Sequence, residues 1–139
     1  MALFSLATTP VRDGIGVELL GEHRVRDQLS AAEELLYVGH REPALVAAGA
    51  ALEGTLRLSA GGVAGPGASA AALLEALLAL RALDDREYDL LYETLEDRDK
   101  LVRGYAPTEG AAEPARITEV FTIVVRLLEG CRTPERPVT

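Results

Sequence analysis

The chain has 139 residues, which suits one domain and leaves little room for two. Hydrophobic residues make up 48% of it but aromatic residues only 4%, so its core must be built from Ala, Leu and Val, a composition that favours packed helices over a β-sandwich. The formal net charge of −8 argues against a broad nucleic-acid surface, because nucleic-acid binders usually carry a basic excess.

Residues 1–23 form an irregular N-terminal segment in this prediction. Gly14 and Gly16 are expected to break a helix, although the run 15–20 fits a short extended or helical piece. We interpret the segment either as a piece that packs on the main domain or as a linker to another domain.

A clear helical period begins at Arg24 and is expected to end near Gly39, which suits a left-handed helix cap. The second helix is predicted over residues 43–60, with glycines stopping it directly afterwards. The glycine-rich segment 61–67 is therefore predicted to be a loop and the most mobile internal segment.

Three further helices are predicted over residues 69–80, 84–103 and 114–130, and the tail 131–139 is expected to fray. The fold class is then all-α: an up-and-down four-helix bundle with one additional short helix. Its connections are short enough for antiparallel neighbours, and residues 24–130 form the domain.

Charged residues fall on or beside the apolar stripes of two of these helices. In the fourth helix the stripe continues onto Arg98 and Asp99, where leucine would be expected. In the second helix Glu53 lies beside the inner face and Arg57 follows one turn later. A buried charge needs a partner, so we expect a bidentate pair between Glu53 and Arg98, or its copy across a dimer. Asp99 or Arg57 would satisfy the remaining groups.

The sequence resembles HEPN domains over roughly residues 24–130. The fourth helix closes with Arg-Asp-Lys-Leu-Val-Arg-Gly over 98–104, which is similar to the Arg-Asn-x-Leu-Val-His-Gly string of that family. The second-helix run 44–53 and the first-helix phrase 32–36 are similar too. The resemblance implies a homodimer with a two-fold contact at the fourth helix, and metal-independent RNA cleavage by an Arg and a His.

The sequence departs from that family where the acid–base group should be. Arg98 matches the family's Arg and Asp99 its neighbour, but Arg103 stands in place of the His. Histidine trades protons near neutral pH, whereas arginine stays protonated and only donates. Tyr105, just past the helix end, is the only nearby candidate to replace it.

Each candidate residue also has a structural interpretation. Arg98 and Asp99 fit an ion pair at a helix or dimer interface. Glu53 and Arg57 have the favourable four-residue spacing of a pair within one helix. Arg103 is a basic residue well placed at a helix C-terminus.

The isolated histidines and the tyrosines are expected to have no ligand role. His23 and His40 are predicted to be exposed to solvent, and Tyr88, Tyr92 and Tyr105 to be core or interface residues rather than a stacking platform. No metal or cofactor site is predicted.

Three functions stay open on this sequence. The leading hypothesis is a non-catalytic HEPN-like module for dimerisation and for RNA, nucleotide or partner-protein binding, with a bacterial defence or toxin–antitoxin setting implied by the resemblance alone. The alternatives are a residual metal-independent ribonuclease and a helical protein–protein interaction domain without a nucleic-acid role. The chain has one cysteine and no apolar run of about 20 residues, so we expect a cytoplasmic protein without a membrane span.

Overall fold

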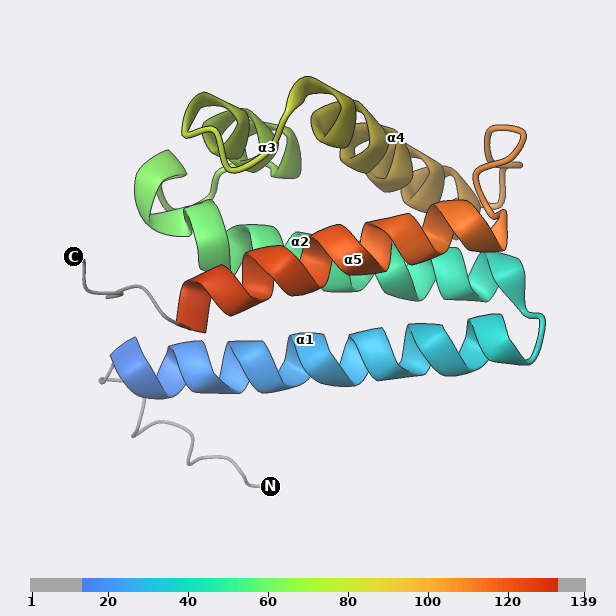
Figure 1. Cartoon of the computed structure of the whole chain (residues 1–139), viewed down its shortest axis with the longest axis horizontal. Helices are drawn as coiled ribbons and strands as arrows, with labels where there is room; N and C mark the ends of the chain where they lie inside the picture. The colour runs from blue at the N-terminus through green and yellow to red at the C-terminus, as the bar shows by residue number, and fades with distance from the viewer. Residues whose placement is uncertain (1–13, 133–139) are drawn as a thin grey trace.

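The computed structural model describes residues 14–132 and is all-helical over that range (Figure 1). No strand occurs among those residues, which confirms the expected fold class. The five helices are α1 (Gly14–Tyr37), α2 (Arg41–Ala64), α3 (Ala70–Ala79), α4 (Asp85–Val102) and α5 (Pro114–Arg132).

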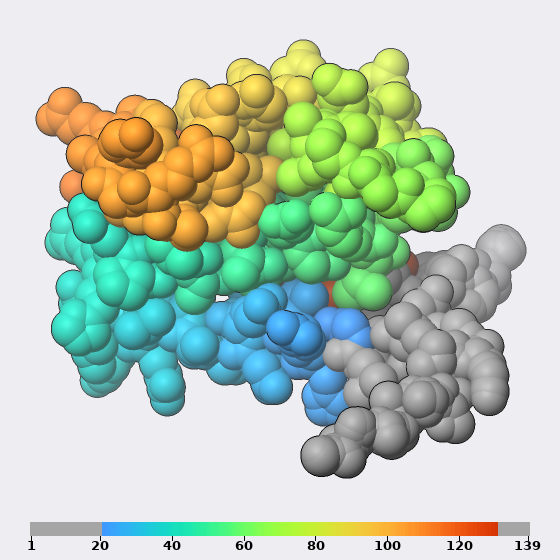
Figure 2. All heavy atoms as spheres, turned by 180° about the vertical axis from the view of Figure 1, so that it is seen from behind, coloured from blue at the N-terminus to red at the C-terminus, as the bar shows by residue number. Residues whose placement is uncertain are grey.

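Helix α2 is the centre of the bundle. It has extensive contacts with α1 and also packs against α3, α4 and α5. Seen from behind, α2 lies between α1 on one side and the layer of α3 and α4 on the other (Figure 2). Helices α1, α2 and α5 run roughly along the long axis of the molecule, whereas α3 and α4 cross it obliquely (Figure 1).

Small residues on α2 let its neighbours approach closely. The core is built mainly from Ala, Leu, Val and Ile, as the composition predicted. A Cβ atom added at Gly54 would lie 2.7 Å from Cγ2 of Val25 on α1, and one added at Gly49 would lie 2.7 Å from Cγ of Arg98 on α4. Both distances are shorter than atoms tolerate, so glycine is required for these two crossings.

Local sequence signals determine most helix ends. Ser69 caps α3 by accepting from the backbone N–H of Ala72, and Asp84 caps α4 in a reciprocal capping box with Glu87. Gly39 and Gly104 end α1 and α4 at positive φ, as expected.

The first helix starts earlier than predicted. It begins at Gly14 rather than Arg24, so residues 14–23 are helical and not irregular. A glycine inside a helix costs only about 1 kcal/mol relative to alanine, and the contacts between α1 and α2 oppose that cost. The rest of that predicted segment, residues 1–13, lies outside the described part of the chain.

The second helix ends later than predicted. It continues through Gly61 and Gly62 to Ala64 and stops at Gly65, where φ is +96°. Helix α1 runs beside α2 with Gly21 next to Leu58, and α2 then passes through Gly61 and Gly62 because glycine permits a left-handed turn without requiring one. Half of the expected loop 61–67 is therefore helical, and its mobility stays a prediction.

The last helix also passes its expected stop. Helix α5 continues beyond Gly130 to Arg132, so only residues 133–139 of the predicted tail lie outside the described chain. Within residues 14–132, no helix combines the length and apolar character that crossing a membrane requires.

Candidate functional site

The predicted site lies where α4 crosses α2. The Arg98 side chain passes directly over Gly49, which has no side chain to obstruct it. Glu53 follows Gly49 by one helical turn, so its carboxylate lies beside the same crossing. The absence of a Cβ atom at one position of α2 thus brings a guanidinium and a carboxylate together from different helices.

Four charged side chains form one connected cluster, which we call the crossing cluster: Glu53, Arg57, Arg98 and Asp99. Arg98 donates from Nη2 to Oε1 of Glu53 at 2.8 Å and from Nε to Oδ1 of Asp99 at 2.9 Å. Arg57 donates from Nη2 to Oε2 of Glu53 at 3.1 Å. The expected pairing of Glu53 with Arg98 within one chain is confirmed, with Arg57 and Asp99 as additional partners.

The pairing differs from the prediction in one respect. Glu53 does not receive both bonds from Arg98; each of its oxygens accepts from a different arginine. Arg57 also donates from Nη1 to the carbonyl oxygen of Ala68 at 2.9 Å, in the connection between α2 and α3. The carboxylate of Glu53 therefore joins α4 to the turn that leads into α3.

Burial and hydrogen bonds shift the pKa values of two members of the crossing cluster, Glu53 and Arg98. The Arg98 side chain is 16% exposed and that of Glu53 is 32% exposed. The hydrogen bond from Arg98 lowers the pKa of Glu53 below its usual value; burial opposes this shift and Arg57 adds to it. Burial opposes the charge on Arg98, but its bonds to Glu53 and Asp99 outweigh burial and raise its pKa. The two arginines and two carboxylates of the cluster balance in formal charge.

Arg103 and Tyr105 are not joined to the crossing cluster. Arg103 is the C-cap of α4 and Tyr105 follows it with 64% exposure, and both contribute backbone N–H groups to the helix end. Neither side chain has a hydrogen bond or ion pair with the residues that the structure describes. Five helical residues turn through about 140°, so Arg98 and Arg103 face different sides of α4.

The remaining expectations concern the histidines and metal binding. His23 and His40 are exposed, as predicted, and His40 precedes α2 without a capping hydrogen bond from its side chain. Among the side chains that the structure describes, those of residues 21–130, no group of three or more His, Cys, Asp or Glu is arranged to hold a metal ion.

One buried acid was missed by the sequence analysis. Asp97 is 1% exposed and accepts from the backbone N–H of Thr108 at 2.8 Å through Oδ1, with Nζ of Lys100 at 3.6 Å. Its other oxygen, Oδ2, is buried without a hydrogen-bond partner among the described residues. The spacing of Leu90, Thr94 and Asp97 on one helical face is the signal that pointed to its burial.

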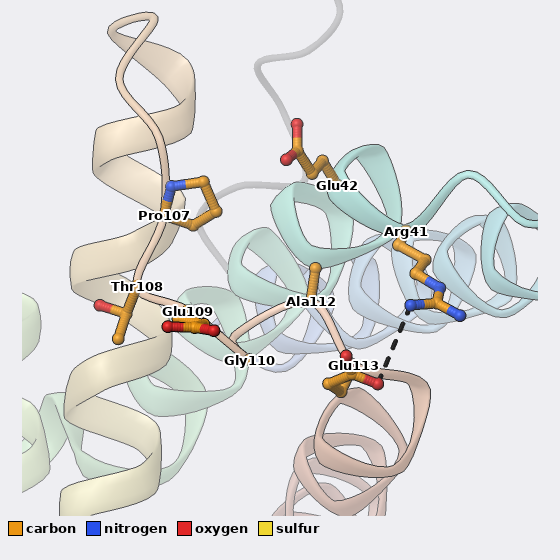
Figure 3. Close-up of a pocket in the computed structure, with 8 residues that line it drawn as sticks. All are labelled: Arg41, Glu42, Pro107, Thr108, Glu109, Gly110, Ala112 and Glu113. Atoms are coloured by element: carbon orange, nitrogen blue, oxygen red, sulfur yellow. Dashed lines mark ion pairs between the residues drawn. The ribbon is translucent and has the colours of Figure 1, made fainter.

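A surface hollow of about 370 Å³ lies between the start of α2 and the connection from α4 to α5 (Figure 3). Arg41 of α2 spans it toward Glu113, with 3.8 Å between Nη1 and Oε1. Thr108, whose backbone N–H donates to Asp97, lines the hollow. None of the predicted site residues lines this hollow.

Comparisons with known proteins supply no relative for this chain. It matches no protein-family model, no curated protein and no solved structure. The functional conclusions therefore depend on the geometry described above.

Proposed function

We propose that this protein is a non-catalytic helical module that associates with a second copy through α4. The observation that supports the non-catalytic part is the crossing cluster, in which both arginines are occupied by internal partners. Arg98 is bound to Glu53 and Asp99, and Arg57 is bound to Glu53 and the Ala68 carbonyl. Arginines neutralised in this way stabilise a helix crossing rather than a phosphate.

The outward face of α4 supports the self-association. Exposed residues one or two helical turns apart share this face: Asp85, Asp89, Tyr92, Glu96 and Arg103. Three of these residues are acidic, and the basic one, Arg103, lies at the C-terminal end of the helix. Two copies of α4 packed antiparallel about a two-fold axis would place Asp85 of one copy opposite Arg103 of the other, with Tyr92 near the axis.

A charge exchange tests this interface. The variants Asp85→Arg and Arg103→Asp should each weaken self-association severalfold in sedimentation velocity, and the double variant should recover most of the loss. Tyr37→Glu is the matched control, because Tyr37 is 91% exposed but lies on α1. Equal weakening by the control, or a double variant as weak as the single variants, would contradict the α4 interface.

RNA or nucleotide contact and a toxin–antitoxin partner follow from the HEPN resemblance alone. The neutral crossing cluster gives RNA no free cationic cleft, so we expect no salt-dependent binding of a single-stranded RNA oligonucleotide near physiological salt. Tight binding that Arg98→Ala abolishes would replace the structural role of this cluster with an RNA-binding one.

A further inference from the structure

Three ion pairs bridge the first half of α4 to α5; we call them the α4–α5 seam. Arg86 of α4 pairs with Glu119 of α5, and Glu93 of α4 pairs with Arg116 of α5. The third is a two-pronged pair, in which Nη1 and Nη2 of Arg126 donate to the two carboxylate oxygens of Glu87 at 2.7 and 3.1 Å.

The ion pairs of the seam connect two helices whose backbones are mostly not in close contact. These two helices approach each other closely at only a few positions, in contrast to the close contact of α1 with α2. Long Arg and Glu side chains therefore make the outer connection. All three pairs are reached by water, since even the most sheltered of their side chains, Glu87, is 17% exposed.

Helix α4 has a narrow apolar face, with Tyr88 and Leu101 partly buried at its edges. More than half of its residues are charged, and its buried apolar residues are Leu90, Leu91 and Leu95. On its other flank it meets α2 through Arg98 and Glu53, again an ion pair. Charged contacts therefore flank α4 on both sides.

Backbone turns at both ends of α4 separate it from its neighbours. Arg81, before the helix, has a φ of +67°, and Gly104 and Gly110, after it, have φ values of +89° and +84°. Each is a point where the helical hydrogen bonds are interrupted and the chain changes direction. A helix bounded in this way can separate from the bundle without unwinding α1, α2 or α5.

We propose that the ion pairs of the α4–α5 seam hold α4 against the bundle. When salt screens these pairs or a substitution removes one, α4 separates locally, before the other helices unfold. Salt shortens the reach of exposed charges from about 10 Å at 0.1 M to about 3 Å at 1 M. Core contacts between apolar side chains are not weakened by such screening. Ionic strength would thus regulate whether α4 is docked, independently of any partner.

Amide hydrogen exchange followed by NMR tests this. Raising NaCl from 0.05 to 1 M should accelerate exchange at Leu91 and Leu95 of α4 about tenfold, because several exposed pairs weaken together, and should leave Leu52 of α2 and Val25 of α1 unchanged. Arg126→Gln should produce a similar, smaller acceleration already at low salt. The matched control is Arg26→Gln, since Arg26 pairs with Glu22 on the same helix.

Two results would overturn this inference. One is exchange at Leu91 and Leu95 that does not respond to salt; the other is equal acceleration in α1, α2 and α4, which indicates global unfolding. The measurement is made at two protein concentrations. A salt effect on α4 at both concentrations supports local opening whether or not the chain self-associates. The measurement therefore distinguishes an error in the proposed α4 interface from an error in the proposed opening of α4.

Discussion

The pair formed by Glu53 and Arg98 is the most informative contact at the scale of single residues. Removing one partner leaves a half-buried charge without its counterion, whereas removing both does not. A double-mutant cycle with Glu53→Gln and Arg98→Met, followed by urea unfolding, should therefore show a coupling free energy of about 1 kcal/mol or more. The matched cycle at Glu22 and Arg26 should show less than about 0.5 kcal/mol. Equal coupling in the two cycles would contradict a special role for the crossing.

Arg81 offers a stabilising substitution. It is the only non-glycine residue with a positive φ in the described part of the chain, and it ends α3 where glycine is usual. Left-handed backbone costs an L-residue about 1 kcal/mol, so Arg81→Gly should raise the free energy of unfolding by up to that amount. Arg81→Ala is the control and should change it little. A less stable Gly variant would show that the Arg81 side chain supports the fold.

The crossing cluster was predictable because its charges interrupt an apolar pattern. Arg98 occupies a position where the helical repeat calls for leucine, and Glu53 lies beside the apolar stripe of α2; opposite charges in such places imply each other. The bridging role of Glu53 was not predictable, since it depends on how far Arg57 reaches toward Ala68. The helical spacing of Asp97 indicates its burial, but its partner could not be predicted, because the backbone N–H of Thr108 has no sequence signature.

At the scale of helices, the ion pairs of α4 predict an acid sensitivity. The hydrogen bonds from Arg126 lower the pKa of Glu87, against the opposing effect of burial, and Arg98 lowers that of Glu53. A lowered folded-state pKa stabilises the fold fully above the unfolded value, about 4.5, and this contribution is lost as pH falls through the folded values. The melting temperature should therefore fall between pH 5 and pH 3, by about 5 °C.

Glu87→Gln isolates the contribution of one carboxylate. Glutamine preserves the capping box with Asp84 and removes the charge that Arg126 requires. This variant should melt lower than the wild type at pH 7 and lose less stability on acidification. An unchanged difference between pH 5 and pH 3 would mean that other carboxylates account for the acid sensitivity.

Helix ends were predicted well where a glycine takes a positive φ and poorly where it stays helical. Gly39 and Gly104 end helices as expected, but the chain stays helical at Gly14, Gly61 and Gly130. A glycine permits a left-handed turn without requiring one. Whether the helix continues depends on the neighbour beside it, and the sequence of one helix does not contain that information.

At the scale of the whole molecule, we expect no RNA cleavage without metal. The arginines of the crossing cluster are bound to internal partners, and Arg103, like any arginine, donates hydrogen bonds and does not act as a base. The two histidines of the sequence, His23 and His40, are exposed and lie outside α4. Structured and unstructured RNA should remain intact in the presence of a chelator. Cleavage that survives repurification and disappears in Arg98→Ala would contradict this prediction.

Sedimentation equilibrium of the unmodified chain tests its proposed self-association most directly. The weight-average mass should rise from one chain toward two as the concentration increases to tens of micromolar, a range typical of modest interfaces. The rise should be smaller at high salt, because the proposed contact between copies of α4 is partly ionic. A mass that stays at one chain over the whole range would contradict the proposed function.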